Sequence, residues 1–187
     1  MQDPVSEIAG VVKGLVSARN ASEQKACLQR YFAPDASFDH PLCSVASGPN
    51  SRDNGVLPIY QWLRCMFTPD IETHQIGFDE KANKLFLDVS QRLTPNVLVV
   101  NKLWAPIVRL IVVLQLQRGA DGKFYVKRQE DFYEPQVLPF GLLPLLGPVT
   151  SAVKHVIGFN CAILTGITQL TIGYWRPGRD PISAKRK

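Results

Sequence analysis

Apolar side chains recur at helical spacing in three segments of the N-terminal part of the chain. The first predicted helix covers residues 4–18, after Asp3, a favourable capping residue, and Pro4, a residue favoured in a first helical turn. A second helix is predicted over residues 20–33 and a third over residues 58–68. Each pattern is typical of a helix that lays one apolar face on a core.

Apolar and polar residues alternate from residue 71 onward, which is the pattern of half-buried β-strands. Two hairpins are predicted, the first with strands at residues 71–79 and 85–89, and the second with strands at residues 103–117 and 124–133. The dipeptide Asp121-Gly122 is a strong signal for the turn of the second hairpin.

Helices followed by strands along the chain predict an α+β fold, because helices segregated in this way cover one face of a mostly antiparallel sheet. We expect a cone-shaped, curved antiparallel sheet covered by three N-terminal helices, which would enclose a hydrophobic pocket. Residues 35–54 are rich in Ser, Pro, Gly and Asn, and we expect only a strand fragment inside a long excursion there.

The C-terminal part of the chain is unusually apolar, and Lys154 is the only formally charged residue between positions 135 and 175. We therefore expect three parts: a cone-shaped α+β domain at residues 1–134, an apolar, helical C-terminal extension at residues 135–175, and a basic tail at residues 176–187.

The extension allows three arrangements. It could pack over the cone as a lid, lie in a membrane interface, or span the membrane as a helix that begins near His155. Gly158, Ala162 and Gly166 would form a seam of small residues on such a helix, which permits close approach of another element. The residues expected to meet a membrane are Phe140, Leu142, Leu143, Leu145, Leu146, Trp175 and Arg176.

The charge and the cysteine content limit the kinds of partner and ligand that we expect for this chain. The net charge of +5 arises mainly from the basic tail, which favours anionic lipid, and no nucleic-acid-binding motif is present. The four cysteines lack zinc-like spacing, so we expect free thiols, no metal and no cofactor. The N-terminus does not resemble a secretory signal, and we expect an intracellular, membrane- or lipid-droplet-associated protein.

A family resemblance rests on four stretches, namely LQRYFAPDA at residues 28–36, FDHP at residues 38–41, Ile59 with Trp62, and QEDFY at residues 129–133. These look like the SigF-like branch, mainly fungal, of the nuclear transport factor two-like superfamily. That superfamily also contains SnoaL-like cyclases, ketosteroid isomerases and scytalone dehydratase. The resemblance covers about residues 5–134. It implies a cone-shaped fold, which in this superfamily occurs in enzymes, small-molecule binders and protein-binding modules.

Enzymes of this superfamily place acid and base residues inside the cone. The matching positions here are Asp35 or Asp39 with His40 near the mouth, and Asp131 on the last strand. His40 and a neighbouring carboxylate could share a proton. The alternative is structural: Asp35 caps a turn, His40 lies in a loop, and Asp131 anchors buried backbone. The residues expected to line a ligand pocket are Tyr31, Trp62, Met66 and Tyr133.

Three functions compete on these grounds. We expect a non-enzymatic, peripherally membrane-associated module whose cone holds a lipid or another apolar ligand, such as a sterol or a fatty acyl chain. The alternative is a small isomerase, cyclase or dehydratase that acts on a polyketide- or steroid-like substrate. A third hypothesis is a protein-binding module that forms a homodimer through the open face of the sheet.

Overall fold

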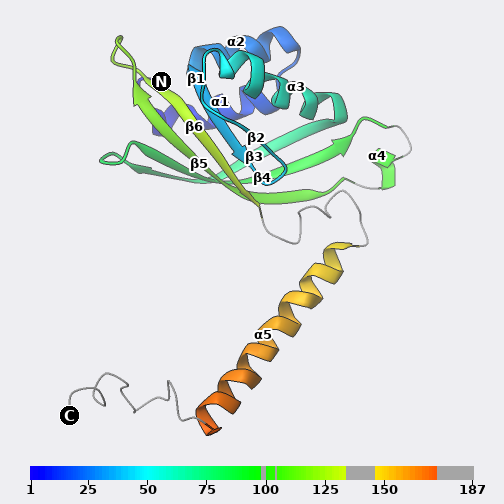
Figure 1. The fold of residues 1–187 in the computed structure, drawn as a ribbon. Helices are drawn as coiled ribbons and strands as arrows, with labels where there is room; N and C mark the ends of the chain where they lie inside the picture. The colour runs from blue at the N-terminus through cyan, green and yellow to red at the C-terminus, as the bar shows by residue number, and fades with distance from the viewer. Residues whose placement is uncertain (98–99, 104, 134–145, 172–187) are drawn as a thin grey trace, which may run out of the picture. The chain divides into compact units, whose positions relative to one another are not determined.

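The structure is a computed structural model that describes residues 1–97, 100–103, 105–133 and 146–171 (Figure 1). The chain divides into two compact units, Met1–Pro144 and Leu145–Lys187, and each unit is described by itself.

A capping residue precedes each of the first two helices, as predicted for Asp3. In α1 (Pro4–Val16), the side chain of Asp3 accepts hydrogen bonds from the backbone N–H groups of Val5 and Ser6. In α2 (Ala21–Tyr31), the side chain of Asn20 accepts one from Glu23. These bonds satisfy N–H groups that have no partner inside the helix.

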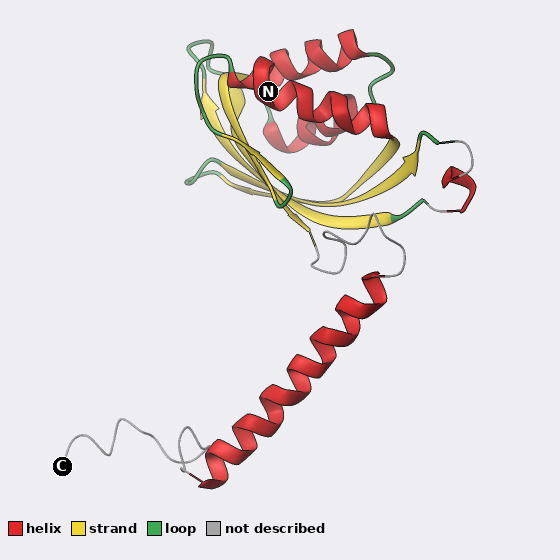
Figure 2. Ribbon diagram, turned by 45° about the vertical axis from the view of Figure 1, so that its right-hand side comes forward, coloured by secondary structure: helices red, strands yellow, loops and turns green. Residues whose placement is uncertain are grey.

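The third predicted helix is also present. It is α3 (Leu57–Met66), which continues directly from a π-helical turn, η1 (Arg52–Val56). A short helix, α4 (Val100–Leu103), precedes the second hairpin. Figure 2 shows α1, α2 and α3 gathered on one side of the curved sheet.

Six strands form one sheet in the order β2-β1-β6-β5-β4-β3. Neighbours pair antiparallel except β1 and β6, which run parallel. Both predicted hairpins are present, as β3–β4 and β5–β6. The strands are β1 (Phe32–His40), β2 (Cys43–Val45), β3 (Phe67–Asp79), β4 (Lys84–Pro95), β5 (Ile107–Arg118) and β6 (Phe124–Tyr133).

All three predicted helices end before the predicted residue, and the first ends at Val16 instead of Ala18. The second and third helices end at Tyr31 and Met66, two residues earlier than predicted in each case, and a strand begins at the next residue. Phe32 and Ala33 are buried in the core as the start of β1. Pro69, expected to follow the third helix, instead lies within β3, where an edge strand tolerates a residue without an N–H group.

The segment predicted as an excursion with a strand fragment is more regular than expected. It contributes most of the nine-residue strand β1, then the three-residue strand β2 and the turn η1. The parallel pairing of β1 with β6 is a long-range contact that local composition does not encode. The predicted α+β class with a curved sheet under helices is confirmed.

The core lies between the helices and the concave face of the sheet. Leu85, Leu87 and Val89 alternate along β4 and are fully buried, and they pack in one cluster with Ile8 and Leu15 of α1. Burying side chains of this size stabilises the fold by about 1.5–3 kcal/mol each.

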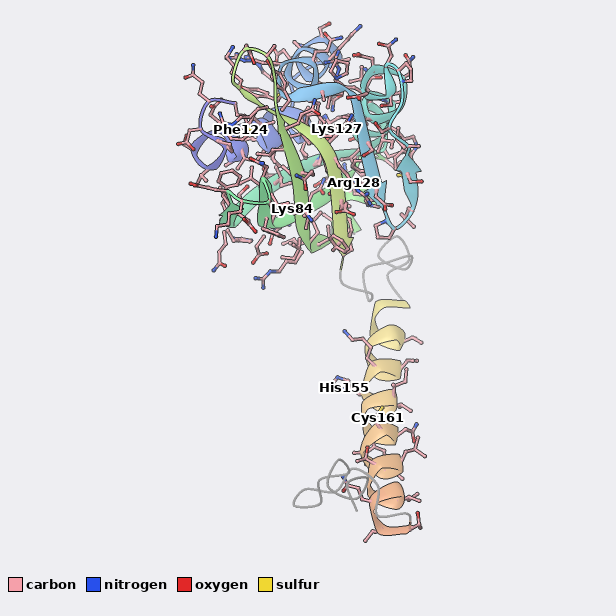
Figure 3. The ribbon with its side chains drawn as sticks, turned by 60° about the vertical axis from the view of Figure 1, so that its left-hand side comes forward. Lys84, Phe124, Lys127, Arg128, His155 and Cys161 are labelled. Atoms are coloured by element: carbon pink, nitrogen blue, oxygen red, sulfur yellow. The ribbon has the colours of Figure 1, made fainter. Side chains whose placement is uncertain are left out.

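The second unit contains α5 (Leu146–Thr171), a helix of 26 residues on which His155 and Cys161 lie (Figure 3). Many of its described apolar side chains are exposed, including Ile157 and Leu164. Among the described residues, no helix combines the length and hydropathy that crossing a membrane requires. Most of the expected membrane-contacting residues, Phe140, Leu142, Leu143, Leu145, Trp175 and Arg176, lie outside the described residues, as does the side chain of Leu146, the first residue of α5.

A buried amide ties the three helices together. The side chain of Gln24 in α2 is 2% exposed, and its Nε2 donates to the carbonyl oxygens of Leu15 in α1, at 2.8 Å, and of Tyr60 in α3, at 3.2 Å. The Leu15 carbonyl lies in the last turn of α1, where carbonyl groups lack helical partners.

Replacing this amide should destabilise the protein. We expect Gln24→Leu to lower the free energy of unfolding by about 1–3 kcal/mol, because it leaves a buried carbonyl without a donor. Urea denaturation measures the change. Gln29→Leu, on the exposed side of the same helix, is the matched control and should lose less than half as much. Equal losses in the two variants would contradict the role of Gln24.

Candidate functional site

A cavity of about 460 Å³ lies between the helices and the concave face of the sheet. Its lining is mostly aliphatic and aromatic, with contributions from α1, α3 and all six strands. A few side chains with polar groups interrupt this lining, and the ones that matter for chemistry are His40, Tyr60, Gln91, Gln129, Asp131 and Tyr133. A cavity of this size and character suits a small, largely apolar molecule.

Asp131 is the acidic residue of this lining. It lies on β6 opposite Val112 of β5, is 9% exposed, and accepts a hydrogen bond from Nε2 of Gln129 at 2.9 Å. Burial disfavours the charged carboxylate and raises the pKa of Asp131 to about 7, an effect that the Gln129 hydrogen bond partly opposes. Near neutral pH, Asp131 can therefore either donate or accept a proton.

A hydrogen-bonded chain leads from α3 to Asp131. The hydroxyl group of Tyr60 donates to Oε1 of Gln129 at 2.8 Å, and the amide nitrogen of Gln129 donates to Asp131. Burial, reinforced by the charge of Asp131, raises the pKa values of Tyr60 and Tyr133, so both phenols stay protonated. The chain fixes the orientation of the Gln129 amide because each end has a defined partner.

His40 contributes an uncharged imidazole to the same cavity. Burial lowers its pKa, and the charge of Asp39 opposes this only in part. Its Nδ1 accepts a hydrogen bond from the backbone N–H of Leu42 at 3.1 Å, which leaves the proton of the neutral ring on Nε2. The ring packs edge-on against Tyr133, with centroids 4.9 Å apart.

The structure separates the four acid/base candidates. His40 and Asp131 line the cavity, whereas Asp35 and Asp39 do not. Asp35 forms an ion pair with Lys127, and Oδ2 of Asp39 lies 3.8 Å from Nη2 of Arg128. The two basic residues lie next to each other on β6 (Figure 3). Side chains alternate along a strand, so Asp39 cannot share the face of its neighbour His40.

The four expected pocket residues also divide. Trp62 and Tyr133 line the cavity. Tyr31 packs against the core and carries the guanidinium of Arg30 over its ring, at 5.3 Å, and Met66 is exposed. Neither of these two side chains is part of the lining.

Two amide side chains of the lining were not expected from the sequence. Gln91 lies in phase with the buried Leu87 and Val89 of β4, and Gln129 lies in phase with Asp131 of β6. The signal that could have found them is a polar side chain at an apolar position of a period-two pattern.

The described residues contain no group of three or more His, Cys, Asp or Glu side chains that could hold a metal ion. The four cysteines are free thiols, and Cys43 is the one that lines the cavity.

Comparison with known proteins gives one family match. Residues 1–174 match the family described as the SigF NTF2-like domain. No curated protein sequence matches the chain significantly.

Two solved structures illustrate the shared fold. An LEH-like epoxide hydrolase from M. tuberculosis is 14% identical, with a TM-score of 0.52, and the match covers 81% of this chain and 99% of that one. AusH from Aspergillus nidulans is also 14% identical, with a TM-score of 0.50, over 69% of this chain and 82% of AusH. At such identities the likeness shows the fold alone.

The perturbed carboxyl of Asp131 has a measurable consequence for stability. Its ordinary pKa is 3.8, whereas its pKa in the folded protein is about 7. Between these pH values the folded state holds the additional proton, so the contribution of Asp131 to stability falls as pH rises from about 4 to about 7. We expect the wild-type protein to lose on the order of a few kcal/mol relative to Asp131→Asn across this range.

Urea denaturation at a series of pH values measures this difference. Asp39→Asn changes an exposed carboxyl outside the cavity and serves as the control, whose profile should follow that of the wild type. Parallel profiles for the wild type and Asp131→Asn would contradict the raised pKa.

Proposed function

We propose, on the premise that this chain belongs to the family of SigF NTF2-like domains, that its cone binds a largely apolar small molecule and moves a proton on it. The family match over residues 1–174 confirms the predicted resemblance to the nuclear transport factor two-like superfamily. The observation that carries the proposal is Asp131, a buried carboxyl with a pKa of about 7 inside a mostly apolar cavity. A general acid or base works best when its pKa lies near the operating pH.

The reaction class that suits this site is isomerisation by proton transfer. The Asp131 carboxylate would remove a proton next to a carbonyl group of the ligand and return it to another carbon, so that a double bond moves and no atom is gained or lost. The phenol of Tyr133 and the Nε2–H of His40 are the donors that could stabilise the intermediate enolate oxygen. Such chemistry requires only groups that line the cavity.

A bicyclic, apolar β,γ-unsaturated ketone tests this proposal, because its conversion to the conjugated isomer is followed by absorbance. We expect Asp131→Asn to lower kcat/KM by about 100-fold or more, since general-base catalysis contributes that much. The wild-type kcat/KM should rise with pH through about 7, as Asp131 loses its proton.

The matched control is Asp39→Asn, which should keep wild-type kcat/KM. If Asp131→Asn binds the ketone as the wild type does and neither protein isomerises it, the cone is a binding module without this activity. If the ketone does not bind to the wild type, the proposal of an apolar-ligand site itself fails.

A second proposal concerns association of the C-terminal extension with a membrane surface. The observation that favours it is the exposure of apolar side chains on α5, including Val153, Ile157 and Leu164, which share one face at helical spacing. Amphipathic helices of this kind adsorb to the headgroup boundary by burying such residues.

Flotation of the full-length protein with anionic and neutral vesicles tests peripheral binding. We expect flotation that survives high salt, and we expect the triple substitution Val153→Ser, Ile157→Ser and Leu164→Ser to weaken it more than tenfold, because each residue contributes about 1.5–3 kcal/mol when buried. The control is Cys161→Ser with Ala162→Ser, two exposed positions of the same helix. Equal flotation of both variants would exclude α5 as the anchor.

Two further expectations stay predictions. The first is a homodimer that forms through the open face of the sheet. Ile111 and Phe132 pair across β5 and β6 and are exposed, which is compatible with this prediction. An intracellular, membrane- or lipid-droplet-associated location is the other.

A further inference from the structure

A second polar residue lies in the cavity apart from Asp131 and its hydrogen-bonded chain. Gln91 of β4 is 4% exposed and is part of the lining. Its Nε2 is buried and has no hydrogen-bond partner among the described residues. An unpaired buried amide N–H group costs about 1–3 kcal/mol, so its presence in a cavity wall calls for a partner that enters from outside the chain.

The strand register separates Gln91 from Asp131. Gln91 pairs with Val108 of β5, and Asp131 pairs with Val112 of the same strand. Two strand spacings and four residues along β5 therefore lie between them, which puts their backbones roughly 16 Å apart along the sheet. Their side chains both reach into the cavity, so the polar groups are closer together than the backbones.

The wall between these two residues is apolar. Leu110 and Val112 of β5, the strand that separates β4 from β6, line it. A molecule that reaches both polar residues must therefore be elongated, apolar in its middle, and provided with a hydrogen-bonding group at each end.

We propose that Gln91 is a specificity-determining residue that recognises a carbonyl or hydroxyl oxygen at the end of the ligand remote from Asp131. The inference rests on the proposed function only in requiring that the cone binds an apolar ligand. Rotation of the amide by 180° exchanges its nitrogen and oxygen, so the same side chain can offer a donor to a carbonyl or an acceptor to a hydroxyl group. The ligand class is an elongated apolar molecule with an oxygen at both ends.

Two esters of equal chain length serve as probes. Dimethyl sebacate carries a carbonyl at each end of an apolar chain, whereas methyl laurate carries one. Their dissociation constants for the full-length protein can be followed by tryptophan fluorescence, because Trp62 lines the cavity. The informative quantity is the dissociation constant of methyl laurate divided by that of dimethyl sebacate. A change in the apolar wall that weakens both esters equally leaves this ratio unchanged.

We expect Gln91→Leu to lower this ratio roughly three- to tenfold, the effect of losing one hydrogen bond to a buried carbonyl. Binding of methyl laurate should stay within about twofold, because its single carbonyl can remain at the Asp131 end. Gln91→Met should repeat the result. The control is Gln117→Leu, on the same sheet but exposed and outside the lining, which should leave the ratio unchanged.

Thermal unfolding without ligand separates recognition from a structural role. We expect Gln91→Leu to keep or raise the unfolding midpoint, because it removes an unpaired amide from an apolar wall. A lower midpoint would mean that the amide is satisfied within the folded protein, by a bound water for example, and would overturn the inference.

The binding outcomes also distinguish this inference from the proposed function. Methyl laurate binding with an unchanged ratio in Gln91→Leu would overturn the role of Gln91 and leave the apolar-ligand site standing. Failure of both esters to bind the wild-type protein would overturn the inference about Gln91, whereas binding and isomerisation of the ketone decide the proposed function separately.

Discussion

The amide of Gln24 is the contact on which the arrangement of the site depends. It bonds to α1 and α3 at once from its place in α2, and so holds the three helices in one position over the concave face. Tyr60, whose carbonyl receives one of these bonds, uses its hydroxyl group to orient Gln129, which in turn bonds to Asp131. A shift of α3 would therefore reach the acidic group through two hydrogen bonds.

Local patterns sufficed for the first three helices and for both hairpins, but not for β1 and β2. The cap at Asp3 and the apolar spacing that follows it specify α1 without any long-range contact, and Gly122, with φ of 75°, adopts the conformation that a glycine in a tight turn favours. The strand ends were harder, because Pro69 is read as a helix stop in isolation and is accommodated only by the edge position of β3.

The site was less accessible to sequence reasoning than the fold. Asp39 and His40 are neighbours in the chain, yet opposite faces of β1 carry them, and only the strand register decides which one meets the cavity. Gln91 and Gln129 attract no attention as residue types. Their importance comes from burial beside an apolar space, which depends on how β4, β5 and β6 pair.

The open form of the sheet has a consequence for the behaviour of the chain among copies of itself. β3 is a 13-residue strand at the edge of the described sheet, and a long edge offers backbone groups to which another chain can add a strand. Pro69 removes one donor there, Asp70 and Glu72 bring negative charge, and a bulge between Thr73 and Gln75 breaks the regular repeat. These features disfavour the pairing of β3 with a strand of another chain. The sheet can therefore stay open at this edge without promoting aggregation.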